Sequence, residues 1–393
     1  MPLDLAVEEG RIVALGRPLL GTAHRTVNAE GCIVLPGVID LHTHLRSPRG
    51  EAGLFTGETA SAVAGGVTTI GDFAYPPGTR FEPEFERKRE WLAAEALCDF
   101  VLHTVVRTQD QVESATTRTV KIFLASSGLG ARAAGGLELI RRSLAKGHQV
   151  LVHVEAMEDY EAISRCIEEA GGSARVHILH VPHQRYVSAM CATGHEGLTM
   201  ETCPHYLLWE WTLGRAGCDV NPPIVPANLW MEVQAGRIMT LGTDHCSYTQ
   251  SEKAEFGLPG FPGLETLLRF AFTFGVRAGR ISLADLCRLL SAGPARILGL
   301  YPRKGAIQIG SDADLVLFCT EHEEIMAAPA YGRGDFSPFT GLGLAGKVIR
   351  TIVRGREMYA DGAADVRSAG WGRSPWSAAA MLPLSPPADR QGV

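Results

Sequence analysis

The chain has 393 residues and a mass of 42.2 kDa, and 46% of its residues are hydrophobic and 20% are charged. A chain of this size and composition can bury a large core, which excludes a single small binding module and a disordered protein. The 43 acidic residues outnumber the 37 basic ones and give a formal net charge of -6, so there is no basic excess to attract nucleic acid.

The first two thirds of the chain carry the pattern of an α/β fold. Residues 11–15 carry apolar positions typical of a small β-strand. From Cys32 onward, short apolar runs recur at the interval of a strand plus a helix. The eight expected strands are 33–41, 67–73, 100–106, 120–125, 150–154, 176–181, 198–202 and 238–242. Helix-like stretches between them include 57–64, 84–97, 136–145, 156–169 and 185–193. Eight alternations predict a (β/α)8 TIM barrel.

The sequence pattern changes in the last third of the chain. Consecutive helices are expected at 263–279 and 282–298, and short strands are expected at 305–310, 313–318, 348–353 and 357–359. We expect residues 1–35 and 303–365 to form one small β-sandwich domain beside a barrel of residues 36–302. Residues 366–393 are rich in Pro, Ser and Ala toward their end and are expected to form a loose tail or an interface arm.

Candidate metal ligands stand at the carboxyl ends of the expected strands. His42 and His44 are two residues apart, so in a strand they point to the same side and could hold one metal ion. His153 and His180 end the fifth and sixth runs, and Asp244 follows the eighth. For His42 and His44 alone, an ordinary role as polar strand-end residues is an equal alternative. Barrel enzymes place their chemistry at this end of the strands, so the full set favours a metal site.

Lys121 lies inside the fourth expected strand. An unpaired ammonium ion inside a barrel mouth would be costly to desolvate, so something must neutralise or use it. Taken alone, a surface-facing lysine is the simpler interpretation, but its place among the candidate ligands favours a functional role.

Two neighbours of the candidate ligands remain open. His177 is three residues before His180, so strand alternation sends it to the opposite face, and a packing role is expected. Asp40 shares a face with His42 and His44, and it either orients a ligand through the other ring nitrogen or has an ordinary strand-end role.

These residues together resemble one family. The segment Pro36-Gly37-Val38-Ile39-Asp40-Leu41-His42-Thr43-His44-Leu45-Arg46, with Lys121, His153, His180 and Thr243-Asp244-His245, is similar to the cyclic amidohydrolases, namely dihydroorotase, dihydropyrimidinase or hydantoinase, and allantoinase. Supporting segments are Ala64-Gly65-Gly66-Val67-Thr68-Thr69, Glu201-Thr202-Cys203-Pro204-His205-Tyr206-Leu207, Asn221-Pro222-Pro223 and Gly310-Ser311-Asp312-Ala313-Asp314-Leu315. The resemblance runs through nearly the whole chain.

The resemblance implies a binuclear metal site. His42 and His44 would bind one divalent ion, His153 and His180 a second, and both ions are expected to be zinc. Lys121 would be carbamylated by carbon dioxide and bridge the two ions, and Asp244 would complete the first site. Histidine and carboxylate ligands also suit cobalt and manganese.

Charge arithmetic agrees with that arrangement. Two divalent ions among neutral imidazoles would leave four positive charges in a partly dry pocket, and a carbamate, Asp244 and a bridging hydroxide supply three negative ones. The hydroxide would attack the ring carbonyl. Asp244 would act as the catalytic base and then deliver a proton to the departing ring nitrogen.

The substrate-binding residues carry mixed signatures. Arg46 stands where dihydroorotases carry an arginine that clamps the substrate carboxylate, although an exposed loop arginine is an alternative. Asn221 also resembles the dihydroorotase loop, whereas Tyr75 lies in a segment nearer to hydantoinases. A second arginine is replaced by Val225, and the tyrosine that hydantoinases use after the bridging lysine is Ser126.

His205 belongs to the shared segment around Pro204 and is a candidate substrate contact, although it has no ligand partner at a suitable spacing and packing is its simpler role. The expected function is therefore hydrolysis of a cyclic amide, dihydroorotase-like with dihydropyrimidinase or hydantoinase features. The alternatives are a dihydropyrimidinase, hydantoinase or allantoinase proper, a noncatalytic assembly relative, and another hydrolysis on the same metal platform.

Cellular setting and assembly are expected from composition and resemblance. Nine cysteines without a CxxC pair indicate reduced thiols. The N-terminus carries Asp4, Glu8 and Glu9 where a signal peptide would be apolar. The sequence also lacks an apolar run long enough to span a membrane, so membrane insertion is not expected. We expect a cytoplasmic homodimer or homotetramer, as the relatives are, that binds a small cyclic amide and neither nucleic acid nor membrane.

Overall fold

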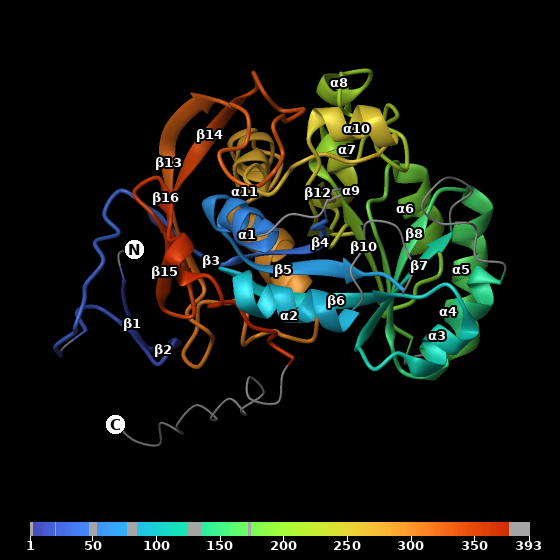
Figure 1. Cartoon of the computed structure of the whole chain (residues 1–393), viewed down its shortest axis with the longest axis horizontal. Helices are drawn as coiled ribbons and strands as arrows, with labels where there is room; N and C mark the ends of the chain where they lie inside the picture. Colours follow the sequence, from blue (N-terminus) through green and yellow to red (C-terminus); the bar gives the residue numbers. More distant parts are fainter. Residues whose placement is uncertain are drawn as a thin grey trace.

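The computed structural model describes residues 3–19, 21–46, 53–76, 85–124, 135–171 and 174–376. Its centre is a barrel of parallel strands, which confirms the expected (β/α)8 fold (Figure 1). The strands in spatial order are β4 (Val38–His44), β5 (Val67–Ala74), β6 (Asp99–Val105), β7 (Thr119–Leu124), β8 (Gln149–Val154), β9 (Val176–Ile178), β10 (Leu198–Thr202) and β11 (Thr240–Leu241). Strand β12 (His245–Cys246) follows β11 after a three-residue break and pairs with β4. The two halves of the eighth strand therefore close the barrel.

Helices cover the outside of the barrel, which explains why its strands are buried along their length. They are α1 (Leu54–Ala64), α2 (Phe85–Glu95), α3 (Gln109–Ser114), α4 (Gly136–Ala145), α5 (Met157–Ala170), α6 (Gln184–Cys191), α7 (Pro204–Leu207), α8 (Trp209–Thr212), α9 (Trp230–Gln234) and α10 (Gln250–Phe256). After them come α11 (Leu267–Phe270), η2 (Ala271–Arg277), α12 (Leu283–Cys287), η3 (Arg288–Ala292) and α13 (Gly293–Ile297). The apolar face of α4, for example, carries Leu139 and Ile140 and packs on β7 and β8.

The first expected strand is not one strand but two. Strand β3 (Ile33–Pro36) pairs antiparallel with the small C-terminal sheet, and β4 begins at Val38 in the barrel. The change of sheet occurs at Gly37, where a Cβ atom would lie 2.1 Å from the hydroxyl of Thr68. The continuous apolar run at 33–41 conceals this switch, because both sheets bury their half of it.

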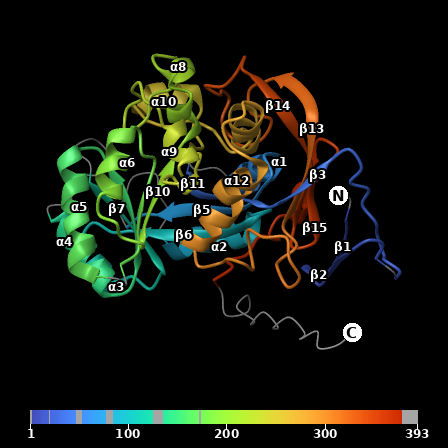
Figure 2. The same cartoon turned by 180° about the vertical axis from the view of Figure 1, so that it is seen from behind.

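A small β structure lies beside the barrel and is built from both ends of the chain (Figure 2). Its five-stranded sheet consists of β3, β13 (Leu315–Ile325), β14 (Gly343–Val353), β15 (Arg356–Ala360) and β16 (Ala363–Ala364). The hairpin of β1 (Asp4–Glu8) and β2 (Arg11–Gly16) covers one face of this sheet, with Ile12 in a cluster with Leu315 and Ile352. The stretch 305–310 is not a strand, contrary to expectation. Only its end is hydrogen-bonded to β2, where the N–H of Gly310 donates to the carbonyl of Ile12 and the N–H of Ile12 donates to the carbonyl of Ser311.

The beginning of the expected loose tail is packed rather than loose. The indole N–H of Trp371 donates to the carbonyl of Val353, and that of Trp376 donates to the carbonyl of Leu298. Aromatic side chains account for this order, because each buries a large ring and satisfies its N–H. Residues 377–393 lie outside the described residues.

A buried ion cluster joins the amino-terminal end of the barrel to the small sheet. The Nζ atom of Lys304 lies 2.7 Å from Asp99, 3.3 Å from Asp312 and 2.5 Å from Asp314. The three carboxylates also converge closely enough to hold a metal ion. The lysine ammonium already occupies that role, so the cluster is a structural link.

Within the described ranges, no helix is both long enough and apolar enough to cross a membrane.

Candidate active site

The expected site residues gather at the carboxyl ends of the barrel strands. A cavity with a volume of about 50 Å³ opens there. Eight of the ten expected site residues line it, namely His44, Arg46, Tyr75, Lys121, His153, His180, Asn221 and Asp244. His42 is fully buried beside them. Ser126, which stands where hydantoinases carry a tyrosine, lies outside the described residues.

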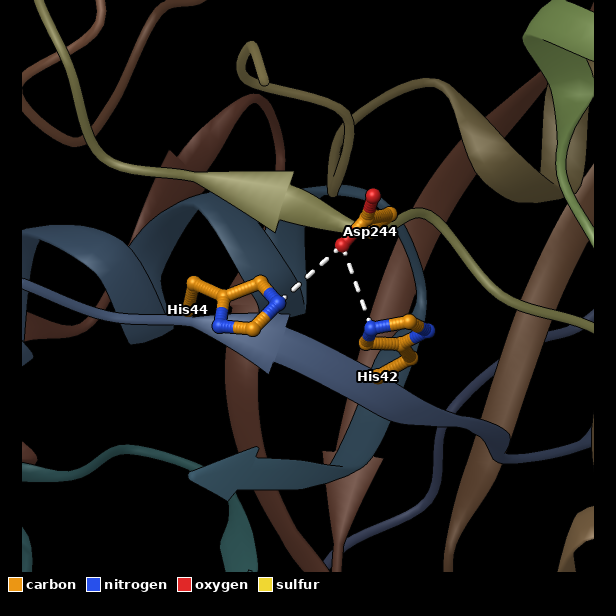
Figure 3. A group of neighbouring side chains, drawn as sticks. All are labelled: His42, His44 and Asp244. Carbon is orange, nitrogen blue, oxygen red and sulfur yellow. Dashed lines mark ion pairs between the residues drawn. The ribbon is translucent and has the colours of Figure 1, made fainter. Parts of the chain in front are cut away.

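His42, His44 and Asp244 form the tightest group (Figure 3). The Nε2 atoms of His42 and His44 each lie 3.1 Å from Oδ1 of Asp244. Burial raises the pKa of Asp244, but the two histidines more than offset this effect and hold the pKa well below its usual value. Burial lowers the pKa of His42, yet Asp244 and Glu201 together raise it to about 9. The group therefore favours a positive charge between its members, as a metal-binding site would.

His153 and His180 form the second histidine pair. Their ring centroids are 4.4 Å apart with an angle of 82° between the ring planes, and the ring of His180 is 5.2 Å from that of His42. Burial lowers the pKa of both residues, which favours the neutral imidazole that binds metal ions. In the part of the chain that the structure describes, the buried Nδ1 atom of His180 has no hydrogen-bond partner.

The backbone is strained at two of these residues. His180 has a φ of 36° and Asp244 a φ of 52°, values that side-chain-bearing residues rarely adopt. Both positions follow the end of a barrel strand, where a sharp turn directs the side chain into the cavity. Such strain is typical of functional sites, where the surrounding structure compensates for it.

Lys121 is completely buried on β7. Its Nζ atom lies 4.7 Å from the ring centroids of both Phe73 and Phe123, and no hydrogen-bond partner for it occurs among the described residues. Burial lowers the pKa of Lys121 to about 7. The neutral amine is therefore readily available near neutral pH, which an ordinary lysine does not offer.

The expected substrate contacts divide into two groups. Arg46 is only 5% exposed and lines the cavity with Tyr75 and Asn221. Its guanidinium lies 5.1 Å from the ring centroid of Tyr248, a neighbour that the sequence analysis did not identify. His205 differs, because it does not line the cavity and its ring packs 5.2 Å from that of Phe261. The structure thus places His205 in a packing position.

The carboxylate beside the His42 ring is Glu201, which sequence reasoning did not assign. Oε1 of Glu201 lies 2.7 Å from Nδ1 of His42. Asp40, considered for this role, instead accepts hydrogen bonds from the N–H and the hydroxyl of Thr243. A detectable signal was present, because Glu201 is a carboxylate inside the otherwise hydrophobic and threonine-rich run of β10.

These side chains fit divalent metal ions. Histidine imidazoles, one ionised carboxylate and a buried lysine converge on one cavity, and buried ring nitrogens of His44 and His180 lack hydrogen-bond partners within the described ranges. Imidazole and carboxylate are ordinary ligands of zinc and related ions. The arrangement can therefore bind a cation beside a carbonyl group and move a proton at Asp244.

Comparisons with known proteins agree with the fold. The sequence profile of the amidohydrolase family matches residues 33–358. D-hydantoinase from Geobacillus stearothermophilus is 28% identical over 91% of this chain and 89% of the relative. A crystal structure of D-hydantoinase has a TM-score of 0.83 at 26% identity and covers 95% of this chain and 94% of the other. The crystal structure of dihydropyrimidinase from Brevibacillus agri has a TM-score of 0.79 at 25% identity, with coverages of 95% and 94%.

Proposed function

Because this chain belongs to the amidohydrolase family, we propose that it hydrolyses an amide bond inside the ring of a cyclic amide or ureide. The observation that carries the proposal is the convergence of His42, His44 and Asp244 on one point, beside a second histidine pair and a buried lysine. The names of the similar proteins, hydantoinase and dihydropyrimidinase, support a cyclic substrate.

Two divalent ions, zinc by preference, are the proposed cofactors. His42, His44 and Asp244 would hold one ion, and His153 and His180 the other. When bound, such ions polarise a carbonyl oxygen and activate water at neutral pH. The chain supplies the neutral imidazole of His180 and the ionised carboxylate of Asp244, which are the forms that bind metal ions.

Lys121 is proposed to carry a carbamate. Its neutral amine would attack carbon dioxide, form a C–N bond and release one proton, which converts the neutral amine into an anionic carbamate. The lowered pKa of Lys121 supports this step, because only the unprotonated amine is a nucleophile. The resulting anion would offset the charge of both metal ions.

Asp244 is proposed as the base and acid of the reaction. Its pKa is held well below the usual range, so the carboxylate is ready to accept the proton of the attacking water. The same carboxyl group then returns a proton to the ring nitrogen as the C–N bond breaks. The positive φ of Asp244 turns its side chain toward the cavity in which the ring would lie.

An acidic ring, such as that of dihydroorotate, is the proposed substrate class within the cyclic amides. Arg46 favours it, because a nearly buried guanidinium in the cavity wall can pair with a substrate carboxylate. Tyr75 stands on the same wall and would pack against a ring of either class. Neutral hydantoin or dihydrouracil rings are the second candidate, and the similar D-hydantoinases favour them.

A substrate panel on metal-loaded protein tests the proposal. Dihydroorotate, dihydrouracil, hydantoin and allantoin would be incubated with the protein, with Asp244→Asn as the inactive control. We expect turnover of at least one ring and its loss after chelation. A protein that binds no metal and opens no ring would support a noncatalytic role, and turnover only of phosphotriesters or acyclic amides would support a different hydrolysis.

A further inference from the structure

We propose that Glu201 is a positioning residue that fixes the ring tautomer and orientation of His42 and thereby sets the affinity of the metal site. Glu201 lies near the end of β10 and is fully buried. A buried carboxylate is costly unless it is paired, so its retention in the barrel core needs a partner. The inference rests on the proposed function, since it concerns a metal ligand.

The first argument is the contact with the ring. Oε1 of Glu201 lies 2.7 Å from Nδ1 of His42, which is hydrogen-bond distance for a charged acceptor. The opposite nitrogen of the same ring, Nε2, lies 3.1 Å from Oδ1 of Asp244. His42 is therefore held between two carboxylates, one inside the barrel and one at the cavity.

The second argument is the direction of this hydrogen bond. A carboxylate oxygen of Glu201 accepts, so Nδ1 of His42 is the donor in the contact. A His42 ring that gives the lone pair of Nε2 to a metal ion would therefore keep its hydrogen on Nδ1, and Nε2 is the nitrogen that faces Asp244.

The third argument is the space made for the carboxylate. A Cβ atom at Gly242 would lie 2.5 Å from Oε2 of Glu201 and 2.6 Å from its carboxyl carbon. Gly242 has no positive φ, so backbone conformation does not require glycine there. The absent side chain therefore leaves room for Glu201.

The remaining contacts connect Glu201 to the second histidine pair. The backbone N–H of His180 lies 3.4 Å from Oε1 of Glu201. Nε2 of His177 lies 3.8 Å from Oε2, and its Nδ1 lies 2.8 Å from the hydroxyl of Thr199. The carboxylate of Glu201 thus lies beside the ring of His42 and the backbone N–H of His180. The ring of His177 lies next to its other oxygen.

Two variants separate acceptor geometry from charge. Glu201→Gln keeps an oxygen that can accept from Nδ1 of His42 but loses the charge, whereas Glu201→Leu removes the acceptor. We expect metal affinity, measured by competition with a chelator, to fall roughly 10- to 100-fold in Glu201→Leu and by a smaller factor in Glu201→Gln. Thr202→Val is the matched control. Thr202 lies on β10 next to Glu201, and the substitution removes the buried hydrogen bond that its hydroxyl donates to the carbonyl of Val181. Its metal affinity should stay within about twofold of the wild type.

Nitrogen-15 NMR of histidine-labelled, zinc-loaded protein gives a readout that a merely structural role would not change. We expect Nδ1–H of His42 in the wild type and in Glu201→Gln, and exchange between tautomers or a weakened zinc contact in Glu201→Leu. If Glu201→Leu does not fold, the smaller loss in Glu201→Gln still decides the question. Unchanged affinity in the Glu201 variants that fold would overturn this inference alone. A wild-type protein that binds no metal would overturn the proposed function together with it.

Discussion

The hydroxyl of Thr243 donates a 2.5 Å hydrogen bond to Oδ2 of Asp40, and the Thr243 N–H donates a second bond to Oδ1 of the same carboxylate. The hydroxyl also accepts from the N–H of His245 at 3.0 Å. Asp244 lies between these tethered residues, at the break in the eighth barrel strand. A carboxylate of the first strand therefore holds the turn that presents Asp244 to the cavity.

Thr243→Val should damage both stability and turnover. The substitution keeps the shape of the side chain but leaves the buried Asp40 carboxylate with fewer partners, which costs about 1–3 kcal/mol in the free energy of unfolding. We expect kcat to fall about 10- to 100-fold, because Asp244 loses its tethered neighbour. Thr240→Val is the matched control, since the buried hydroxyl of Thr240 has no hydrogen-bond partner in the described part of the chain. Equal losses in the two variants would contradict the tether.

Arg46→Gln should discriminate between ring classes. Loss of a charge-assisted pair costs about 1.5–3 kcal/mol, so kcat/KM for an acidic ring such as dihydroorotate should fall roughly 10- to 100-fold. For hydantoin or dihydrouracil we expect less than about a threefold change. Arg107→Gln is the control, because Arg107 lies 6.0 Å from the same Tyr75 ring as Arg46 but does not line the cavity. An equal fall in kcat/KM for acidic and neutral rings would contradict a contact between Arg46 and a substrate carboxylate.

Local patterns predicted the barrel well because each of its strands is buried on both faces. Such strands read as apolar runs, and ligands at their carboxyl ends are visible as polar interruptions. The switch at Gly37 was missed, since an apolar run does not say which sheet buries it. The strand expected at 305–310 was wrong for a related reason, because only the end of this stretch, at Gly310, bonds to the neighbouring strand β2.

The supporting partners of the site were beyond local patterns. Glu201 and His42 are 159 residues apart, and Thr243 and Asp40 are 203 residues apart. Strand position alone left Asp40 with two possible roles, and only the folded chain shows that it contacts Thr243. Partners of this kind depend on which strands become neighbours, and a single sequence does not encode that in adjacent residues.

Lys304→Met should destabilise the fold without changing the site chemistry. The substitution leaves Asp99, Asp312 and Asp314 buried together without their shared cation. Breaking a buried ion group in this way costs about 3–5 kcal/mol, which thermal or denaturant unfolding would measure. Lys347→Met is the control, because Lys347 is only partly buried on β14 and should cost less than about 1 kcal/mol. If Lys304→Met had the same Tm as the wild type, the cluster would not stabilise the contact between the barrel and the small sheet.

Carbon dioxide should be required to rebuild the site after metal removal. In metal-depleted protein, Lys121 would revert to an amine, and zinc added in buffer free of carbon dioxide should restore activity slowly or incompletely. Bicarbonate should accelerate recovery, and carbon-13 NMR with labelled bicarbonate should detect a carbamate that is absent from Lys121→Met.

The pH dependence of this recovery tests the buried lysine directly. The pKa of Lys121 is lowered to about 7, so the nucleophilic amine predominates above that pH and the ammonium form below it. At fixed dissolved carbon dioxide, the recovery rate should rise as the pH increases through about 7 and then level off. An ordinary lysine, with a pKa of about 10.4, would give a rate that continues to rise up to about pH 10. That steady rise would show that burial does not lower the pKa of Lys121, whereas full recovery without carbon dioxide would exclude the carbamate.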